Sequence, residues 1–340
     1  MLSAFYFKHK EKIHRSFLGL VVAKCFQAGN WIFNFLYEHK LLRTKDIGSA
    51  IISIGNVSIG GSGKTPFCLF LAKELEKRKI AFSFVSKGYG AKTRIKKPFV
   101  LSEGRGPKYD AKKASDEAVL LSHIFPKVPV IVGNDLLQAC LIAKPFAPLM
   151  IIDDGMQHRK LKKSVEIVIL DSIEPFGKQA FFPRGFLRDS LTQLKRADLV
   201  VGYSDVETQL RRYTTAPFVQ VTKTPINAES IANENIAVFT AIGNPKNLYH
   251  TLEEVGAKIV EKQEFLDHSF FDKKELQAFA KRVKAKGAKY LVCTQKDAMK
   301  VDKSWDLGLQ IFILEIELNI KKHQNTFNEF LNKLAVNYDN

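Results

Sequence analysis

From residue 50 onward, short apolar runs alternate with segments in which apolar residues recur at helical spacing. The short runs are rich in Ile, Val and Leu and almost free of polar residues, which is typical of strands buried on both faces of a parallel sheet. Strands are expected at 51–54, 81–85, 128–132, 149–152, 166–170 and 199–203, and helices at 66–79, 115–125, 135–143 and near 189–195. The pattern predicts an α/β fold whose mostly parallel sheet is flanked by helices.

A second, shorter series of the same kind follows Thr224-Pro225. Strands are expected at 236–240, 258–261, 290–293 and 310–316, and helices at 248–255, 273–285 and 325–335. We therefore expect three parts: an N-terminal segment at 1–40, a core domain at 41–225 and a smaller α/β domain at 226–340.

The N-terminal segment has the basic and apolar regions of a signal peptide but lacks a suitable cleavage site. Four basic residues between Lys8 and Arg15 precede an apolar run at 17–23, but Lys24 interrupts the run directly before Cys25. The uncharged stretch from Cys25 to Tyr37 has thirteen residues, fewer than the roughly 20 needed to cross a bilayer. Aromatic anchors with basic flanks predict an amphipathic helix or helix pair lying in a membrane interface. Packing of this helix on its own domain is the alternative.

The net charge of +17 is concentrated in two segments. Residues 1–45 contribute +6 and residues 77–113 contribute +10, while the rest of the chain is nearly neutral. Such basic surfaces usually contact phosphate groups of nucleic acid, anionic lipid or an acidic substrate. An apolar content of 46% excludes a disordered protein, and four widely separated cysteines favour a reducing compartment without structural zinc.

The strongest chemical motif follows the strand expected at 51–54. Its glycine-rich loop and the start of the next helix comprise Gly60, Gly61, Ser62, Gly63, Lys64, Thr65 and Pro66. In a phosphate loop the backbone N–H groups face the phosphates, a lysine neutralises their charge and a hydroxyl ligates Mg²⁺. Lys64 and Thr65 fit these last two roles, although Ser58 stands where the strict spacing requires glycine. The motif predicts binding of ATP or GTP.

A second motif, Met150-Ile151-Ile152-Asp153-Asp154-Gly155-Met156-Gln157-His158-Arg159, ends another apolar run. Carboxylates at the end of a strand, downstream of a phosphate loop, are the partners that Mg²⁺ requires, directly or through water. Asp153 and Asp154 are therefore candidate magnesium ligands.

Together with Gly55-Asn56 and the phosphate loop, this Asp-Asp-Gly-Met-Gln-His block resembles the tetraacyldisaccharide 4'-kinase family of lipid A biosynthesis. Further blocks agree in the family's order over about residues 15–320: Lys87-Gly88-Tyr89-Gly90, Ser115-Asp116-Glu117-Ala118, Phe182 to Asp189, Ile242 to Pro245, Asp267-His268 and Thr294 to Ala298. The chain departs from the family's pattern at Ala91, Ala118, Arg184-Gly185-Phe186, Ser269 and Gln295. None of these residues is assigned to phosphate, magnesium or proton transfer.

The resemblance implies ATP- and Mg²⁺-dependent phosphorylation of the 4'-hydroxyl of a tetraacylated glucosamine disaccharide 1-phosphate, giving lipid IVA. It also implies two α/β/α domains joined by a short linker, and peripheral attachment to the cytoplasmic face of the bacterial inner membrane. The expected partners are the lipid substrate and an anionic membrane surface. Neither nucleic acid nor an obligate protein partner is expected.

The resemblance also assigns roles to individual residues. Asp116 matches the aspartate that accepts the hydroxyl proton, and His268 matches the histidine that the second domain places beside it. Arg188 matches an arginine that holds phosphate or transition-state charge, and Lys64 acts with it on the phosphates. Three further members of matching blocks receive no fixed role: Glu117, Gln157 and His158.

Two other classes of P-loop NTPase compete with this interpretation. An NTPase associated with nucleic acid would need stacking aromatics in the basic segment, but two of its five aromatics, Phe82 and Phe84, fall in an expected strand. An assembly GTPase would need a guanine-specifying segment of the Asn-Lys-x-Asp type. Thr294-Gln295-Lys296-Asp297 imitates that segment only loosely, because glutamine replaces the asparagine and Asp297 comes one position early.

Overall fold

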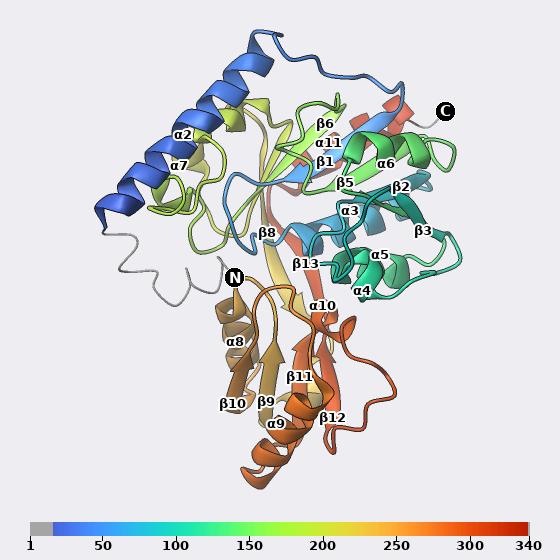
Figure 1. Cartoon of the computed structure of the whole chain (residues 1–340), viewed down its shortest axis with the longest axis vertical. Coiled ribbons are helices and arrows are strands. Elements are labelled where there is room, and N and C mark those ends of the chain that lie inside the picture. Colours follow the sequence, from blue (N-terminus) through green and yellow to red (C-terminus); the bar gives the residue numbers. More distant parts are fainter. Residues whose placement is uncertain (1–15, 339–340) are drawn as a thin grey trace.

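The structure is a computed structural model that describes residues 16–338, and it contains two sheets flanked by helices (Figure 1). The large sheet has nine strands in the order β13-β8-β7-β6-β1-β5-β2-β4-β3, and the small sheet has four in the order β10-β9-β11-β12. All neighbouring strands are parallel except the β13–β8 and β3–β4 pairs. This confirms the expected α/β fold with a mostly parallel sheet and a smaller second sheet.

The strands of the large sheet are β1 (Ala50–Gly55), β2 (Phe82–Ser86), β3 (Phe99–Glu103), β4 (Pro129–Val132), β5 (Leu149–Asp153), β6 (Val165–Leu170), β7 (Leu199–Gly202), β8 (Phe218–Pro225) and β13 (Ile316–Lys322). The helices around it are α2 (Phe17–Glu38), α3 (Lys64–Lys77), α4 (Ala111–Ala114), α5 (Asp116–Ile124), α6 (Leu136–Ala143), α7 (Glu207–Leu210) and α11 (Gln324–Tyr338), with 3₁₀ turns at Gly177–Gln179 and Leu191–Arg196. The central strands β1 and β5 are buried throughout, which explains their continuous apolar sequences.

The small sheet contains β9 (Asn235–Thr240), β10 (Lys258–Glu264), β11 (Tyr290–Thr294) and β12 (Gln310–Leu314). It is accompanied by α8 (Pro245–Glu254), α9 (Lys273–Ala285), the short α10 (Gln295–Ala298) and a 3₁₀ turn at Ala228–Ile231. Leu276, Phe279 and Val283 of α9 are buried against one face of the sheet, while Leu248 and Leu252 of α8 belong to a separate buried cluster.

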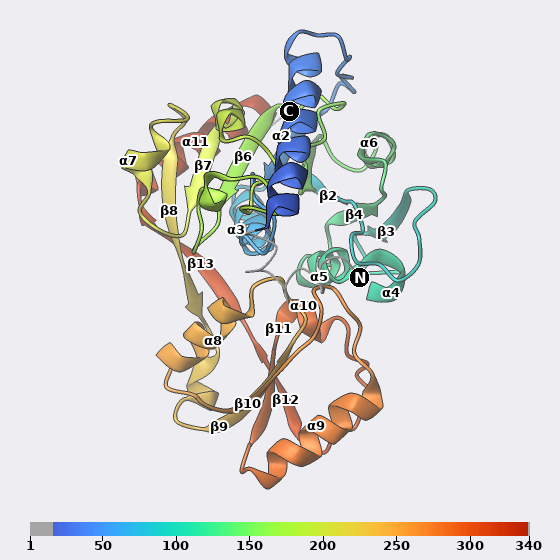
Figure 2. The ribbon, with the colours of Figure 1, turned by 60° about the vertical axis from the view of Figure 1, so that its left-hand side comes forward.

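The chain returns to the large sheet after β12, so the expected assignment of 226–340 to one smaller domain is wrong in its last part. The single strand expected at 310–316 is two strands in different sheets, because β13 pairs with β8 instead of continuing β12. α11 then covers the large core, where the ring of Phe327 stacks on Phe70. Two antiparallel chain segments therefore connect the sheets: β8 leads from the large sheet towards the small one, and β13 returns (Figures 1 and 2).

The N-terminal segment is one helix over its described residues. α2 lies along the outside of the large-sheet unit (Figure 1), and most of its large apolar side chains are exposed. Its buried residues are small or polar: Gly19, Ala23 and Asn34. Among residues 16–338, no helix is long and apolar enough to span a bilayer. The basic residues expected to precede the helix, from Lys8 to Arg15, lie outside the described residues.

Candidate functional site

The two nucleotide-site motifs meet at the carboxyl ends of β1 and β5. These strands are parallel neighbours in which Ile54 is paired with Asp153. The loop after β1 and the acidic residues after β5 therefore emerge side by side. The carboxyl edge of a parallel sheet is the usual position for a ligand in folds of this class.

The glycine-rich loop has the backbone that a phosphate cradle requires. Gly60 and Gly63 have positive φ angles of 120° and 82°, which residues with a side chain adopt only with strain. α3 begins at Lys64, so its N-terminal N–H groups and the positive end of its dipole face the loop. Ser58 is buried within hydrogen-bond distance of Asn56, with 3.4 Å between Asn56 Nδ2 and Ser58 Oγ.

Tyr203 braces the last glycine of the loop. Its hydroxyl donates a hydrogen bond of 2.8 Å to the carbonyl of Gly63, and a Cβ added at Gly63 would lie 2.3 Å from the same hydroxyl oxygen. Burial of Tyr203 raises the pKa of its phenol well above the ordinary value, so the hydroxyl stays protonated and able to donate. Tyr203 lies at the end of β7 and was not identified from the sequence.

We expect Gly63→Ala to weaken nucleotide binding about tenfold, a change of about 1.4 kcal/mol. The alanine would have to adopt a left-handed backbone, which costs about 1–2 kcal/mol, and would also collide with Tyr203. Gly106→Ala is the matched control, because Gly106 has nearly the same φ of 81° but open space around it. Calorimetric titration with ATP checks the result. Equal affinities for the two variants would contradict the bracing role of Tyr203.

Asp154 is the centre of a cluster of cations. Lys64 Nζ lies 3.6 Å from one of its carboxylate oxygens, and Lys87 Nζ and Arg188 Nη1 lie 3.9 and 3.0 Å from the other. Burial opposes ionisation of Asp154, but Arg188 and Lys64 together hold its pKa well below the usual range. Asp154 therefore gathers the cations that would contact the phosphates.

Asp153 has a different environment, although it is the adjacent residue. It is buried, and its Oδ1 has no hydrogen-bond partner among the described residues. Burial and the nearby carboxylate of Glu117 raise the pKa of Asp153 to about 7. An uncompensated buried carboxylate is costly, and a bound cation would remove that cost.

The side-chain oxygen atoms near Asp153 are suitable ligands for Mg²⁺. Thr65 is the second residue of α3, and its hydroxyl donates to Glu117 Oε1 at 3.4 Å. Within residues 16–338, no three His, Cys, Asp or Glu side chains form a preformed metal cluster. Mg²⁺ does not require one, since it commonly takes one or two protein oxygens and completes its shell with phosphate oxygens and water.

Asn56 connects the phosphate loop to the residues that follow β5 and to Arg188. In the sequence it stood out only as a member of the phosphate-loop motif. Its Nδ2 donates to Ser62 Oγ at 2.8 Å, and its carbonyl accepts from Gln157 Nε2 at 2.9 Å. Arg188 Nη2 makes close contacts with both Asn56 Oδ1 and Asp154 Oδ1. Gln157, which received no role from the sequence, and Arg188 thus both lie at the phosphate loop.

His158, in contrast, makes no described contact with Asp116 or His268. Burial and the nearby Lys87 lower the pKa of its imidazole to about 4, so it is neutral near pH 7. Its backbone N–H donates to the Gly155 carbonyl at 2.9 Å. These contacts place His158 in the turn after β5 rather than beside Asp116.

The predicted Asp–His pair forms between the two sheets. Asp116 is the first residue of α5 and is 2% exposed, and His268 lies in the loop that follows β10. His268 Nδ1 is 3.1 Å from Asp116 Oδ1, which also accepts from the Glu117 backbone N–H at 2.9 Å. Asp116 Oδ2 has no hydrogen-bond partner among the described residues and faces Lys300 Nζ at 3.5 Å.

The charges around Asp116 keep it ionised. Burial alone would raise its pKa, but the charges of Lys296 and Lys300 and the hydrogen bond from His268 outweigh burial and hold the pKa well below the ordinary value. Lys300 is itself buried and pairs with Asp297 at 2.9 Å. Asp297 in turn accepts hydrogen bonds from Thr240 and Thr294, so residues at the ends of two strands of the small sheet hold the partner of Lys300 in place.

Two loops close the contact between the sheets. The Tyr89 and His268 rings meet nearly perpendicular to each other with 4.9 Å between centroids, and a Cβ added at Gly90 would lie 2.6 Å from His268 Cβ. On the other side, a Cβ added at Gly61 would lie 3.5 Å from the Asn244 backbone nitrogen. The Gly243-Asn244 loop of the small sheet therefore packs directly on the phosphate loop.

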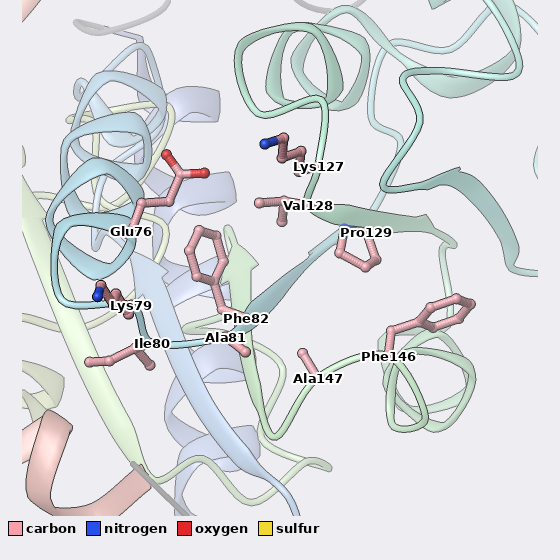
Figure 3. Close-up of a pocket in the computed structure, with 10 residues that line it drawn as sticks. All are labelled: Glu76, Lys79, Ile80, Ala81, Phe82, Lys127, Val128, Pro129, Phe146 and Ala147. Atoms are coloured by element: carbon pink, nitrogen blue, oxygen red, sulfur yellow. The ribbon is translucent and has the colours of Figure 1, made fainter.

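A separate surface pocket lies at the opposite edge of the large sheet (Figure 3). Its walls come from the end of α3 and from the segments that lead into β2, β4 and β5, including Ile80, Phe82, Val128 and Ala147. These are the amino ends of the parallel strands, whereas the phosphate loop and Asp153 are at carboxyl ends. The pocket contributes nothing to the site described above.

Comparison with known proteins agrees with the geometry. A family model described as Tetraacyldisaccharide-1-P 4'-kinase matches residues 15–335. The Tetraacyldisaccharide 4'-kinase of Syntrophus aciditrophicus is 30% identical over 333 residues, which cover 88% of each chain. The Chlamydia abortus protein of the same name is 33% identical over 294 residues, covering 80% of this chain and 79% of the relative.

The fold also matches a solved structure. The crystal structure of LpxK from Aquifex aeolicus in complex with ATP superposes with a TM-score of 0.73 at 24% identity. The match covers 92% of this chain and 97% of the other. It establishes that the two chains share an architecture.

Proposed function

The chain belongs to the tetraacyldisaccharide-1-P 4'-kinase family and is a kinase of lipid A biosynthesis, and we propose that it transfers the γ-phosphate of ATP to the 4'-hydroxyl of a tetraacylated glucosamine disaccharide 1-phosphate. The product of this reaction is lipid IVA. The observation that carries the assignment is the contact of Asp116 with His268, formed between the sheets beside a phosphate loop. An NTPase acting on nucleic acid or in assembly would not need this pair.

The nucleotide phosphates would bind at the carboxyl edge of β1. The loop at 60–63 and the α3 N-terminus offer N–H donors, while Lys64 and Arg188 offer positive charge. Thr65 and Asp153 would hold Mg²⁺, which supplies charge neutralisation on the β- and γ-phosphates when bound. The ATP complex of the Aquifex aeolicus LpxK supports ATP as the donor.

Asp116 would orient the acceptor hydroxyl and receive its proton. Its Oδ1 is already used by His268 and by the Glu117 N–H, so Oδ2 is the oxygen left for the substrate. A strongly ionised carboxylate suits a loose phosphoryl-transfer transition state, in which the hydroxyl needs positioning more than early deprotonation. Oδ2 is buried, so residues around it would have to shift for the acceptor to enter.

The test of this function is direct transfer. The full-length protein is incubated with ATP labelled in the γ-phosphate, Mg²⁺ and the disaccharide 1-phosphate lipid in detergent, and the lipid is analysed for label and its position. We expect label on the 4'-oxygen. Binding of ATP without any labelled lipid would overturn the proposal, and RNA-stimulated hydrolysis instead would favour the competing class.

We also propose that the protein binds peripherally to the cytoplasmic face of the bacterial inner membrane. α2 exposes Phe17, Leu18 and Trp31, with 63% of Trp31 accessible. A different side of the helix is fixed to the core, since Asn30 and Asn34 both donate to Asp189 Oδ1 at 3.0 Å. A helix held by its polar side and apolar on its free side is suited to a lipid interface.

The second basic segment lies next to the acceptor side of the site. Its exposed residues Lys92, Arg94, Lys96 and Lys97 follow the loop at 87–90 that packs on His268. Clustered cations of this kind attract anionic lipid and add roughly 1 kcal/mol per residue near a charged membrane. We propose that this segment binds the anionic surface in which the lipid substrate is embedded.

We expect the triple variant Phe17→Ser, Leu18→Ser, Trp31→Ser to float several-fold less with vesicles containing anionic lipid. The three side chains are exposed, so the melting temperature should change little. Leu141→Ser is the control, because Leu141 is an exposed apolar residue on another helix, α6. Flotation equal to that of the unmodified protein would show that α2 is not the membrane-binding surface.

A further inference from the structure

Lys296 joins the two halves of the site through a single ammonium group. It lies on α10 of the small-sheet unit, with its side chain 17% exposed. Its Nζ is 2.9 Å from Glu117 Oε1 of α5 and 3.3 Å from His268 Nε2. The sequence motifs that contain Lys296 assign it no role of its own in the site.

This geometry determines which nitrogen of His268 carries the proton. An ammonium group has three donors and no acceptor, so a nitrogen at hydrogen-bond distance from it must accept. His268 Nε2 is that nitrogen, which leaves the proton on Nδ1, pointing at Asp116 Oδ1 at 3.1 Å. We propose that Lys296 is a positioning residue that holds His268 in the neutral Nδ1–H tautomer.

The other groups around His268 are consistent with this tautomer. Asp116 of α5 faces Nδ1, and the Tyr89 ring is uncharged. The Asp267 carboxylate would by its charge favour a proton on Nε2, but its Oδ1 lies 3.7 Å away, beyond hydrogen-bond distance. Burial would lower the pKa of Lys296, but Glu117 and Asp116 outweigh burial and raise it, so the side chain remains an ammonium. An imidazolium would direct its Nε2–H at this ammonium, which is unfavourable.

The inference deepens the proposed function and rests on it, because it explains how Asp116 is prepared to receive a proton. With Nδ1–H donating to Oδ1, the imidazole stabilises the carboxylate and leaves Oδ2 for the acceptor hydroxyl. The bond from Lys296 to Glu117 anchors the same ammonium to α5, the helix that carries Asp116. The tautomer is thus coupled to contact between the sheets.

Nitrogen NMR on the full chain labelled with ¹⁵N-histidine tests the proposal without any substrate. The spectrum of His268→Gln identifies the His268 signals by their loss. In the unmodified protein near pH 7.5 we expect a protonated Nδ1 and an unprotonated Nε2. An Nε2–H tautomer or an imidazolium in the unmodified protein would overturn the proposal before any lysine variant is made.

The lysine variants supply the second readout. Lys296→Met should shift His268 towards the Nε2–H or imidazolium form and lower kcat about 10- to 100-fold, less than the loss of the base itself. Lys296→Arg keeps a cationic donor and should recover most of both effects. Lys303→Met removes an exposed charge from the same segment and should change neither. A lowered kcat with an unchanged tautomer would contradict a positioning role.

The two proposals can fail separately. If the lipid receives no phosphate but His268 shows the expected tautomer, the proposed reaction is wrong and the contact geometry is right. If the lipid is phosphorylated but the tautomer differs, the reaction stands and the role of Lys296 is wrong.

Discussion

Replacing Asp116 with asparagine is expected to lower kcat by about 10²–10⁴ while leaving ATP affinity nearly unchanged. The amide keeps the size of the side chain but cannot take the hydroxyl proton, and it would present an N–H group towards Lys300. Asp116 lies on α5, outside the phosphate loop, so nucleotide contacts should survive. Steady-state transfer to the lipid and calorimetric titration with ATP separate the two effects.

Glu103→Gln is the matched control, because Glu103 is an exposed carboxylate on β3. The same assays over pH give a second check on Asp116. Since the pKa of Asp116 is held well below 3.8, its carboxylate stays ionised as pH falls from 7 towards 5, and it should produce no acidic limb in kcat/KM over that interval. Normal turnover by Asp116→Asn would remove Asp116 from the role of base.

The second large effect is expected for Arg188→Met, which should lower kcat by about 10²–10³. The guanidinium contacts Asp154 and Asn56 at once, so it is positioned at the edge of the phosphate loop. Arg188→Lys should recover little of the loss. An ammonium cannot reproduce the planar fork that contacts both partners.

Arg212→Met serves as the control for loss of an exposed arginine. If Arg188 acts on the transferred phosphate, kcat should fall more than ATP affinity does. A variant that loses only ATP affinity would place Arg188 in ground-state binding instead. The melting temperature should also be followed, because loss of Arg188 leaves Asp154 with Lys64 and Lys87 as its remaining ion-pair partners.

The sequence predicted those parts of the fold that depend on residues close together along the chain. A buried parallel strand is a continuous apolar run, so β1, β5 and β6 were recognised within a residue or two. The phosphate loop was recognised because its strand, glycines and helix are consecutive. β13 was missed as a separate strand because its pairing with β8, nearly a hundred residues earlier, leaves no local trace.

The same distinction applies to the site. Asp116 and His268 are 152 residues apart, on a helix beside the large sheet and in a loop of the small-sheet unit, so only the resemblance to a known family linked them. The contact of Lys296 with Glu117 spans 179 residues and had no motif to reveal it. Asn56 was visible within its motif, but its role as a shared partner of Ser62, Gln157 and Arg188 required three dimensions.

The central claim is that residues of the two sheets act together as one site on the lipid hydroxyl. A double-variant cycle with Asp116→Asn and His268→Gln, measured as kcat for phosphate transfer to the lipid, tests it most directly. Groups that act as a unit are strongly non-additive, so the double variant should be no slower than the slower single variant by more than about threefold. Losses that multiply in full would show that Asp116 and His268 act independently, and would contradict a shared site.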